Sequence, residues 1–304
     1  MDKLQAMTVF VQIAERGSLT AAAEALDKSL PSVVRILASL EETLQVRLFN
    51  RTTRRIALTE EGRIYLENCR RILAEIDDAE SMLGQNETEP RGVITVTAPV
   101  RFGEMHVAPA VTRFLQRHPE VQVKLLLLDR VIDMLEEGVD VAVRIAPLAD
   151  SSLAAKPVGH IRRIVCASPK LLGEVGRPGR PEDLAVLPCV RFTGISSGSV
   201  WHFFRNGKQF QVTVNGRLIC NQAGPAVNAC SAGLGFGMFL CYQVMPAVQR
   251  GELELVLTDF EPEPLPLSLV FPHHRLLSTR LRIFMDWMTK AIPESLQAGV
   301  RDQS

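Results

Sequence analysis

The sequence predicts an α/β protein in which a small winged helix-turn-helix domain of the all-α type precedes a larger, two-lobed α/β domain. Three observations predict it: two short helical patterns followed by a basic hairpin, one long amphipathic stretch, and then alternating strand and helix patterns. A chain of 304 residues is long enough for both domains. The predicted boundaries are 1–60 for the winged domain, 59–84 for a linker and dimerisation helix, 85–92 for a hinge, and 93–304 for the larger domain. In that domain the first lobe takes about 93–162 and 267–304, and the second about 163–266.

Composition limits the function classes. Thirty-four basic and 34 acidic residues give a formal net charge of zero, which argues against a chain coated in basic charge but leaves room for a local basic patch. No apolar run approaches the roughly 20 residues that span a bilayer, and the N-terminal stretch is amphipathic rather than a signal peptide. The six cysteines form no C-x-x-C pair. We therefore expect a cytoplasmic protein without membrane association, metal or cofactor.

The first helical pair lies between residues 18 and 44. Ser18 or Thr20 is a suitable N-cap for a short helix that carries Ala21, Ala22, Ala25 and Leu26. Asp27-Lys28 interrupts this pattern, and Ser29 can cap a second helix with Pro31 in its first turn, where a missing N–H does no harm.

The second helix has one apolar face and one open face. Helical spacing predicts that Val33, Leu37, Leu40 and Leu44 face inward. It directs Leu30, Ser32, Arg35, Ile36 and Ser39 outward, with Val34 at the boundary. Small residues in the first helix permit close approach, so the second helix can protrude into a major groove.

A basic hairpin is expected next. Val46–Phe49 and Ile56–Leu58 are the expected strands, and four arginines without an acid lie between Arg47 and Arg55. Arginine suits phosphate and guanine edges, so the hairpin is a sensible wing. The alternative is a small helical domain with a solvated charge cluster.

A helix is predicted from Thr59 to about Leu83. Its apolar residues alternate spacings of four and three, as in a heptad seam: Tyr65, Cys69, Ile72, Ile76, Ala79 and Leu83. Such a one-sided helix needs a partner, and we interpret it as a homodimer contact. The alternative is packing against its own domain.

Beyond a polar hinge from Gly84 to Gly92, strands and helices alternate, which predicts a parallel sheet. The expected elements of the first unit are strands 93–97, 121–128 and 139–145 and helices 102–118 and 131–137. A second unit begins near Arg163 and includes 181–184, 189–192, 212–218, a helix over 223–232 and a strand over 234–240. Asn206-Gly207 predicts a two-residue hairpin turn, and the chain returns through 265–271 to a final helix over 279–291. Crossings between the units are expected near 162–164 and 262–266.

Ligands of open α/β sheets bind beyond the carboxyl ends of the strands. The residues at those ends are Ala98, Pro99, Val100, Arg101, Phe102, Arg144, Asn221, Phe239 and Pro272. A helix N-terminus beside Arg101 favours a carboxylate, so a small organic anion is the preferred effector. The alternative is that Arg101 and Arg144 are ordinary solvated arginines.

These stretches together resemble the LysR-type transcriptional regulators. The resemblance is carried by LQAMTVFVQIAERGSLTAAAEAL, VRILASLE and RLFNRTTRRIALTEEG, and continues through RGVITVTAP, DVAVRI, SSLAAKPVG and AGLGFGMFL. It implies a periplasmic-binding-protein-like (type 2) effector domain, an operator in double-stranded DNA, and assembly into tetramers, whereas the heptad seam alone supports only pairing. It also implies DNA contacts by Leu30, Pro31, Val34, Arg35, Arg51 and Arg54, to which their neighbours Ser32, Thr52 and Arg55 are added.

The chain departs from the family pattern at three positions. The family often has a polar residue where Leu30 stands, a serine where Val34 stands and a glycine where Gln45 stands. Leu30 and Val34 can meet a thymine methyl but cannot hydrogen-bond to a base.

Rival functions have weaker support. An enzyme is disfavoured because no G-x-S-x-G elbow, Walker loop, H-E-x-x-H or dinucleotide fingerprint occurs. A transport-associated solute receptor would need an export signal. The remaining alternatives are a redox sensor that uses Cys220 and Cys230, and a two-lobed binder without a DNA function.

Overall fold

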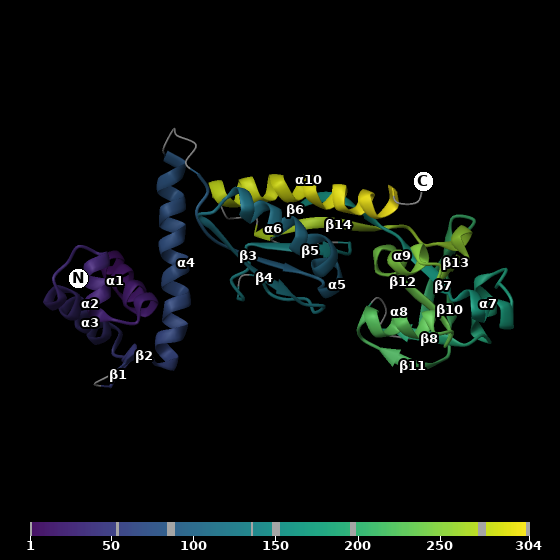
Figure 1. Cartoon of the computed structure of the whole chain (residues 1–304), viewed down its shortest axis with the longest axis horizontal. Coiled ribbons are helices and arrows are strands. Elements are labelled where there is room, and N and C mark those ends of the chain that lie inside the picture. Colours follow the sequence, from purple (N-terminus) through teal and green to yellow (C-terminus); the bar gives the residue numbers. More distant parts are fainter. Residues whose placement is uncertain are drawn as a thin grey trace. The chain divides into compact units, whose positions relative to one another are not determined.

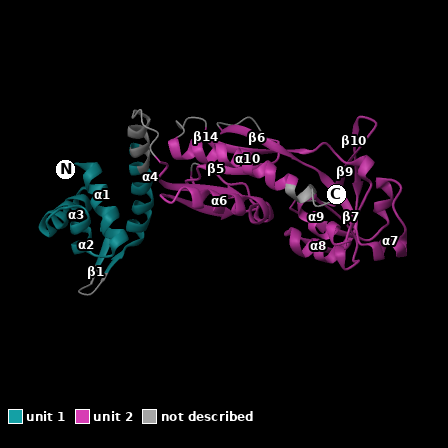
Figure 2. Cartoon of the chain, turned by 45° about the horizontal axis from the view of Figure 1, so that its top comes forward, with its two compact units in different colours: residues 1–88 teal, residues 89–304 magenta. Residues whose placement is uncertain are grey.

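The computed structural model describes residues 2–52, 55–83, 89–134, 136–147, 153–194, 199–272 and 278–301. The side chains at 51, 52, 55, 74, 75, 77–83 and 298–301 lie outside that description. The chain divides into two compact units, residues 1–88 and 89–304 (Figure 2). Each unit is described by itself.

Unit 1 is a helix-turn-helix followed by a hairpin and a long helix (Figure 1). Ser18 and Ser29 are the N-caps of the second and third helices, as predicted, and each hydroxyl accepts a backbone N–H three residues on. The elements in order are α1 (Lys3–Arg16), α2 (Leu19–Ala25), α3 (Leu30–Leu44), β1 (Phe49–Thr52), β2 (Arg55–Leu58) and α4 (Glu60–Leu83).

The core of unit 1 confirms most of the predicted inward face of α3 and corrects its edges. Val33, Leu37 and Leu40 are buried, whereas Leu44, the last residue of α3, is 37% exposed. Ile36, expected on the outside, is half-buried and packs against the core. In α2 the core residues are Ala22 and Ala23, while Ala25 is exposed.

The first wing strand begins at Phe49 rather than at Val46. The carboxylate of Glu41 accepts the backbone N–H groups of Leu48 and Phe49, at 2.8 and 3.3 Å. These bonds tie the start of the hairpin to α3, and the ladder begins with Phe49 opposite Leu58.

The first sheet of unit 2 is mixed, not purely parallel as predicted. β3 pairs in parallel with β4 and β5, whereas β14 lies antiparallel between β5 and β6. The returning strand β14 enters from the other lobe and therefore runs in the opposite direction. The strands are β3 (Gly92–Ala98), β4 (Val121–Leu127), β5 (Val141–Ile145), β6 (Leu153–Ile161) and β14 (Leu265–Pro272).

Two long helices accompany this first sheet and contact each other. The first runs without a break through α5 (Val100–Phe102), the π-turn η1 (Gly103–Val107) and α6 (Ala108–Arg117). The second, α10 (Thr279–Arg301), continues through Pro293 and is longer than the predicted 279–291. Trp287 joins the two, because its indole N–H donates to the carbonyl of Ala110 at 3.0 Å.

The helix predicted over 131–137 is wrong. Among its described residues, Ile132 and Met134 are buried and Val131 is 81% exposed, which is strand-like alternation rather than a helical face. The carboxylate of Asp133 accepts the N–H of Glu136, and Gly138 has a φ of 63°, so the segment forms turns.

The second sheet of unit 2 is also mixed, with the order β11-β8-β12-β7-β13. β8 is parallel to β11 and β12, while β7 is antiparallel to β12 and β13. The elements are β7 (Arg163–Ala167), α7 (Pro169–Val175), η2 (Pro181–Ala185), β8 (Cys189–Phe192), β11 (Gly216–Cys220), α8 (Ala223–Ser231), β12 (Phe236–Leu240), α9 (Cys241–Gln249), β13 (Glu254–Val256) and η3 (Thr258–Phe260).

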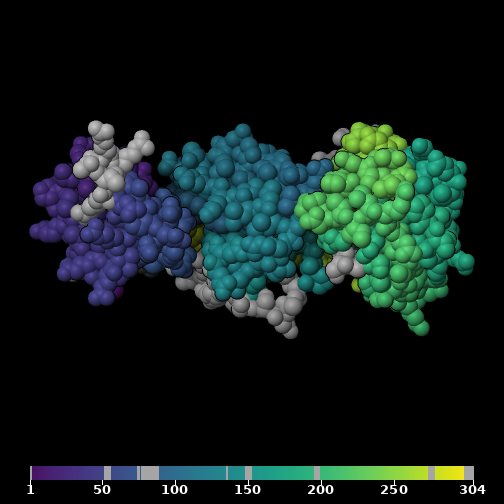
Figure 3. Space-filling model, turned by 90° about the horizontal axis from the view of Figure 1, so that it is seen from below, coloured from purple at the N-terminus to yellow at the C-terminus, as the bar shows by residue number. Residues whose placement is uncertain are grey.

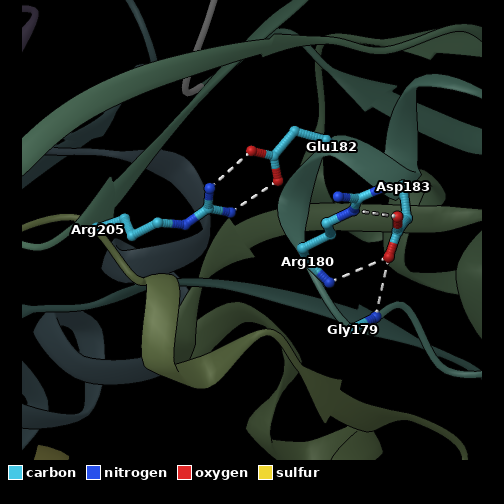
Figure 4. Close-up of polar contacts among 5 residues, drawn as sticks. All are labelled: Gly179, Arg180, Glu182, Asp183 and Arg205. Carbon is cyan, nitrogen blue, oxygen red and sulfur yellow. Dashed lines mark hydrogen bonds and ion pairs between the residues drawn. The ribbon is translucent and has the colours of Figure 1, made fainter.

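A separate hairpin, β9 (Val200–Arg205) with β10 (Lys208–Thr213), packs on this lobe. Asn206 and Gly207 have φ values of 50° and 76°, which confirms the predicted two-residue turn. Arg205 forms two hydrogen bonds to Glu182 of η2, at 2.8 and 2.7 Å, beside the Arg180–Asp183 pair (Figure 4). The strand predicted over 212–218 is in fact the end of β10 and the start of β11.

Lobe I contains a buried histidine that should make the protein acid-sensitive. Burial lowers the pKa of His106 to about 4, and its Nδ1 lies 2.8 Å from Ser295 Oγ. The unfolded chain takes up this proton near pH 6.5, so stability from the neutral ring is complete above that pH and is lost as the pH falls towards 4. The loss should reach roughly 3 kcal/mol.

Urea titrations of the full-length protein between pH 7 and pH 4 test this expectation. As the pH falls, the free energy of unfolding of the wild type should decrease more steeply than that of His106→Gln. The difference in slope should correspond to about one additional proton taken up on unfolding. Equal slopes for the two proteins would contradict it.

Candidate DNA interface and effector site

The outward face of α3 carries one charged side chain in its first ten residues. Arg35 is exposed, and it makes no ion pair with the described part of the chain. Leu30, at the start of the helix, is 41% exposed, Pro31 is exposed, and Val34 and Ser32 are half-buried. All five helix residues predicted to contact DNA therefore reach the surface of the domain.

The predicted wing forms, but its tip lies outside the description. β1 and β2 pair antiparallel, with Thr52 opposite Arg55. The residues at 53–54 and the side chains of Arg51, Thr52 and Arg55 are not described, so the phosphate contacts predicted for the wing remain predictions.

The linker helix divides between two roles along its length. Cys69 is fully buried in the core of unit 1, and the ring of Tyr65 lies 5.4 Å from that of Phe10. Because Cys69 is fully buried in its own domain, its assignment as a dimer contact is wrong, whereas the half-buried Tyr65 stays a prediction. The first half of α4 therefore packs against its own domain, as the alternative interpretation of this helix predicted.

Farther along α4, the apolar stripe loses contact with the domain. Leu73 still packs against the core, whereas Ile72 and Ile76 are half-buried and belong to no hydrophobic core among the described residues. The side chains of Ala79 and Leu83 lie outside the description. Ile72 and Ile76 are thus the described seam positions that remain open to a partner.

The predicted effector edge lies where β3 ends and α5 begins. Pro99, Val100 and Arg101 are half-buried there, and Ala98 is buried beneath them. The N–H groups at the start of this helix were expected to be open to a ligand carboxylate, and Val100 carries the first of them. Its N–H donates instead to Asp129 Oδ1 at 3.0 Å, so a carboxylate of the chain itself holds this position.

Asp129 also links the two lobes. Its second oxygen accepts from Gln222 Nε2 at 2.9 Å, and Gln222 is the N-cap residue of α8 in lobe II. On the face drawn in Figure 3, the blue-teal surface of lobe I borders the green surface of lobe II. Both residues were missed from the sequence, although Asp129 directly follows the predicted strand 121–128 and Gln222 follows the predicted Asn221.

The two predicted arginines both have partners in the chain. Arg101 pairs with Glu104 at 3.3 Å, and an Nη of Arg144 donates to the carbonyl of Ile132 at 3.4 Å. The Arg101 pair is exposed and weak, so Arg101 can turn to a ligand at little cost. Arg144 is half-buried at the end of β5.

Three of the predicted lining residues are core residues instead. Phe102 is fully buried and makes an edge contact with Tyr242 at 5.1 Å, and Phe239 is fully buried and stacks on Phe192. Pro272 is also buried. Asn221, by contrast, is exposed beside Gln222. Phe102, Phe239 and Pro272 were predicted from their positions at strand ends, but their side chains are buried within the lobes.

Tyr242 is a second contact between lobes that the sequence did not reveal. It is the second residue of α9 in lobe II, yet its ring packs in the core of lobe I against Phe102 and His106. Burial raises the pKa of its hydroxyl, which stays neutral at any physiological pH. The chain passes between the sheets at Arg162, whose guanidinium makes two 2.7 Å hydrogen bonds to Glu261 next to the second crossing.

The structure argues against the redox alternative. Cys230 is fully buried, and burial raises its pKa well above the ordinary value, so little reactive thiolate forms. Cys220 is half-buried, and its Sγ donates to the carbonyl of Gln222 at 3.2 Å. Both cysteines are free thiols.

Comparison with known proteins extends over both units. Residues 4–63 match the bacterial regulatory helix-turn-helix model of the LysR family, and residues 87–293 match the LysR substrate-binding domain. No helix in the described ranges is long and apolar enough to cross a membrane.

Similar proteins include both transcriptional repressors and transcriptional activators. The HTH-type transcriptional repressor PA14_22550 of Pseudomonas aeruginosa is 32% identical, over 97% of this chain and 94% of its own length. The transcriptional activator AaeR of Escherichia coli is 30% identical, over 95% and 94%. The structure of CrgA, a LysR-type transcriptional regulator from Neisseria meningitidis, is 32% identical and superposes with a TM-score of 0.60, covering 95% of this chain and 98% of that one. The chain therefore belongs to the LysR family of DNA-binding transcriptional regulators, proteins that carry an effector-binding domain and are not enzymes.

Proposed function

We propose that this regulator recognises a specific operator through the first half of α3. The observation that carries the proposal is the outward face of that segment, where Leu30, Pro31 and Arg35 are exposed beside a two-stranded wing. The N-terminal half of such a helix fits into a major groove, and a basic wing can contact the adjacent phosphates. In this proposal Arg51, Thr52, Arg54 and Arg55 supply the wing contacts, and Ser32 supports the helix contact.

A randomised duplex pool tests the operator proposal. The purified full-length protein should enrich a defined sequence with two similar half-sites, and the enriched duplex should bind more tightly than a scrambled one at the same salt concentration. Equal retention of every sequence would remove the claim of specificity.

We also propose a homodimer formed through the distal half of α4. Ile72 and Ile76 are the described positions that no intradomain core covers. A two-fold dimer would place two copies of α3 about one helical turn apart on the DNA, roughly 34 Å. Assembly of dimers into a tetramer, and a cytoplasmic location beside the chromosome, belong to the same proposal.

For the effector we propose a small organic anion at the end of β3, in the place that Asp129 occupies. The backbone N–H of Val100 already holds a carboxylate, and Arg101 lies next to it in an exposed ion pair. A ligand that displaces Asp129 would also free Gln222, so its binding would change how the lobes are held together. Ligand binding can shift the lobes only as far as its affinity differs between the two arrangements.

Titration calorimetry of the full-length protein against a panel of small organic acids and their amides tests this effector class. Asp129→Asn removes the charge of the internal competitor, so it should bind the acid about tenfold more tightly than wild type. The matched variant Asp133→Asn, which removes the same charge from the neighbouring turn, should not. Binding of an amide but of no acid would rule out the anion.

A further inference from the structure

The operator-contacting face of α3 is mostly hydrocarbon. Among its first nine residues, Leu30, Pro31 and Ala38 are exposed and Val34 is half-buried. No acidic residue occurs between Lys28 and Leu40, and Arg35 is the one charged group there. The hydrogen-bonding side chains in these turns are the exposed Arg35 and the short hydroxyls of Ser32 and Ser39, both half-buried.

Packing within the domain does not explain these apolar side chains. Leu30, with 41% of its surface exposed, belongs to no hydrophobic core of the described residues, and neither does Val34. The neighbouring Val33 and Leu37 are buried and already form the inward face of α3. Leu30 and Val34 are four residues apart, so they form one ridge along the flank of the helix.

The chemistry of the major groove offers one partner for such a ridge. Each base pair presents hydrogen-bond donors and acceptors there, and only thymine adds a methyl group. Leucine and valine side chains neither donate nor accept, so at cytosine, adenine or guanine they would cover a polar edge and leave it unpaired. At thymine they exclude water from two apolar surfaces at once.

Resting on the proposed operator binding, we propose that this protein reads its half-site largely through thymine 5-methyl groups, with Leu30 and Val34 as the specificity-determining side chains. Arg35 is then the long hydrogen-bonding side chain on this face, and its fork matches a guanine. The half-site should thus contain one guanine beside two thymine methyls on the path of the ridge.

Replacing thymine by deoxyuridine tests this directly, because the exchange removes the methyl and leaves base pairing unchanged. The site enriched from a random pool is synthesised as a series of duplexes, each with one thymine position replaced in both half-sites. The affinity of the full-length protein for each duplex is measured by fluorescence anisotropy at fixed salt. One buried methyl corresponds to about fourfold in affinity, so replacement in both half-sites should weaken binding about sixteenfold.

The variants assign each methyl to a side chain. For Leu30→Ala, replacing thymine by deoxyuridine at one position of the half-site should no longer change the affinity. For Val34→Ala, the same should hold at a different thymine. Ser39→Ala, a small change farther along the same helix, should keep the wild-type difference at both positions. Circular dichroism spectra matched to wild type would show that the variants are folded.

The outcomes separate this inference from the proposed function. If a site is enriched and bound but every deoxyuridine duplex binds like its thymine parent, the methyl readout is wrong while the operator proposal stands. Full methyl sensitivity in both alanine variants would also overturn it. If no sequence is enriched and no duplex is bound, the operator proposal itself fails, and the inference fails with it.

Discussion

Replacing Arg35 with alanine is expected to weaken binding to the selected operator by about tenfold to a hundredfold, the range of one bidentate arginine–guanine contact. Arg35 is exposed on α3 and has no ion-pair partner in the described part of the chain, so its loss leaves no buried charge behind. The fold and the dimer should therefore be unchanged. If the contact is to guanine, the loss should also relax sequence preference at one base pair in each half-site.

The matched control is Arg71→Ala. It removes one positive charge from an exposed position on α4, where the guanidinium donates to Asn68 Oδ1 at 3.2 Å. This variant should bind within about twofold of wild type, because a distant charge is screened over about 8–10 Å. Equal losses in Arg35→Ala and Arg71→Ala would mean that α3 has no special role in the contact.

Placing a glutamate at Ile72 or Ile76 is expected to convert the dimer to monomers and thereby abolish tight operator binding. Neither side chain belongs to the core of its own domain, so the new charge should not disturb the packing of Cys69 and Leu66. A charge buried without a partner in a paired-helix contact costs several kcal/mol. Loss of the dimer would also remove the second half-site, leaving each monomer with one weak contact.

Sedimentation velocity of the full-length protein measures this effect. Arg71→Glu, which adds an acid next to the seam but on an exposed position of the same helix, should remain dimeric. A dimer that persists in both Ile72→Glu and Ile76→Glu would place the interface elsewhere on the chain.

Local chemistry made much of unit 1 predictable. The caps Ser18 and Ser29, the limits of α3 and α4, and the inward face of α3 follow from side chains that act on their own neighbourhood. In unit 2 the turn at Asn206-Gly207 was predictable for the same reason, since both residues accept a positive φ. Strands with continuous apolar runs, such as β12, were also found from composition.

Long-range contacts account for most of what the sequence did not show. A heptad stripe on α4 does not reveal that its first half meets α1, where Glu15 bonds to Arg70 at 3.0 Å. The end of a strand does not reveal whether the next side chain turns into a cleft or into the lobe, as Phe102 and Phe239 do. The Asp129–Gln222 bond joins residues far apart in the sequence, and no local pattern predicts it.

The direction of β14 was hidden for a related reason. Alternating strands and helices predict a parallel sheet, but a strand that returns from another lobe is not bound by the crossover rule. The antiparallel pairing of β14 with both β5 and β6 follows from that return.

We expect the first sixty residues to present a helix and an arginine-tipped hairpin to duplex DNA, two copies at a time. Mass photometry of the full-length protein with fragments of its own genome, over a series of salt concentrations, measures this most directly. We predict that a small subset of fragments binds two chains or a multiple of two, with an affinity that falls steeply as salt rises. A protein that binds no fragment even at low salt would contradict the account.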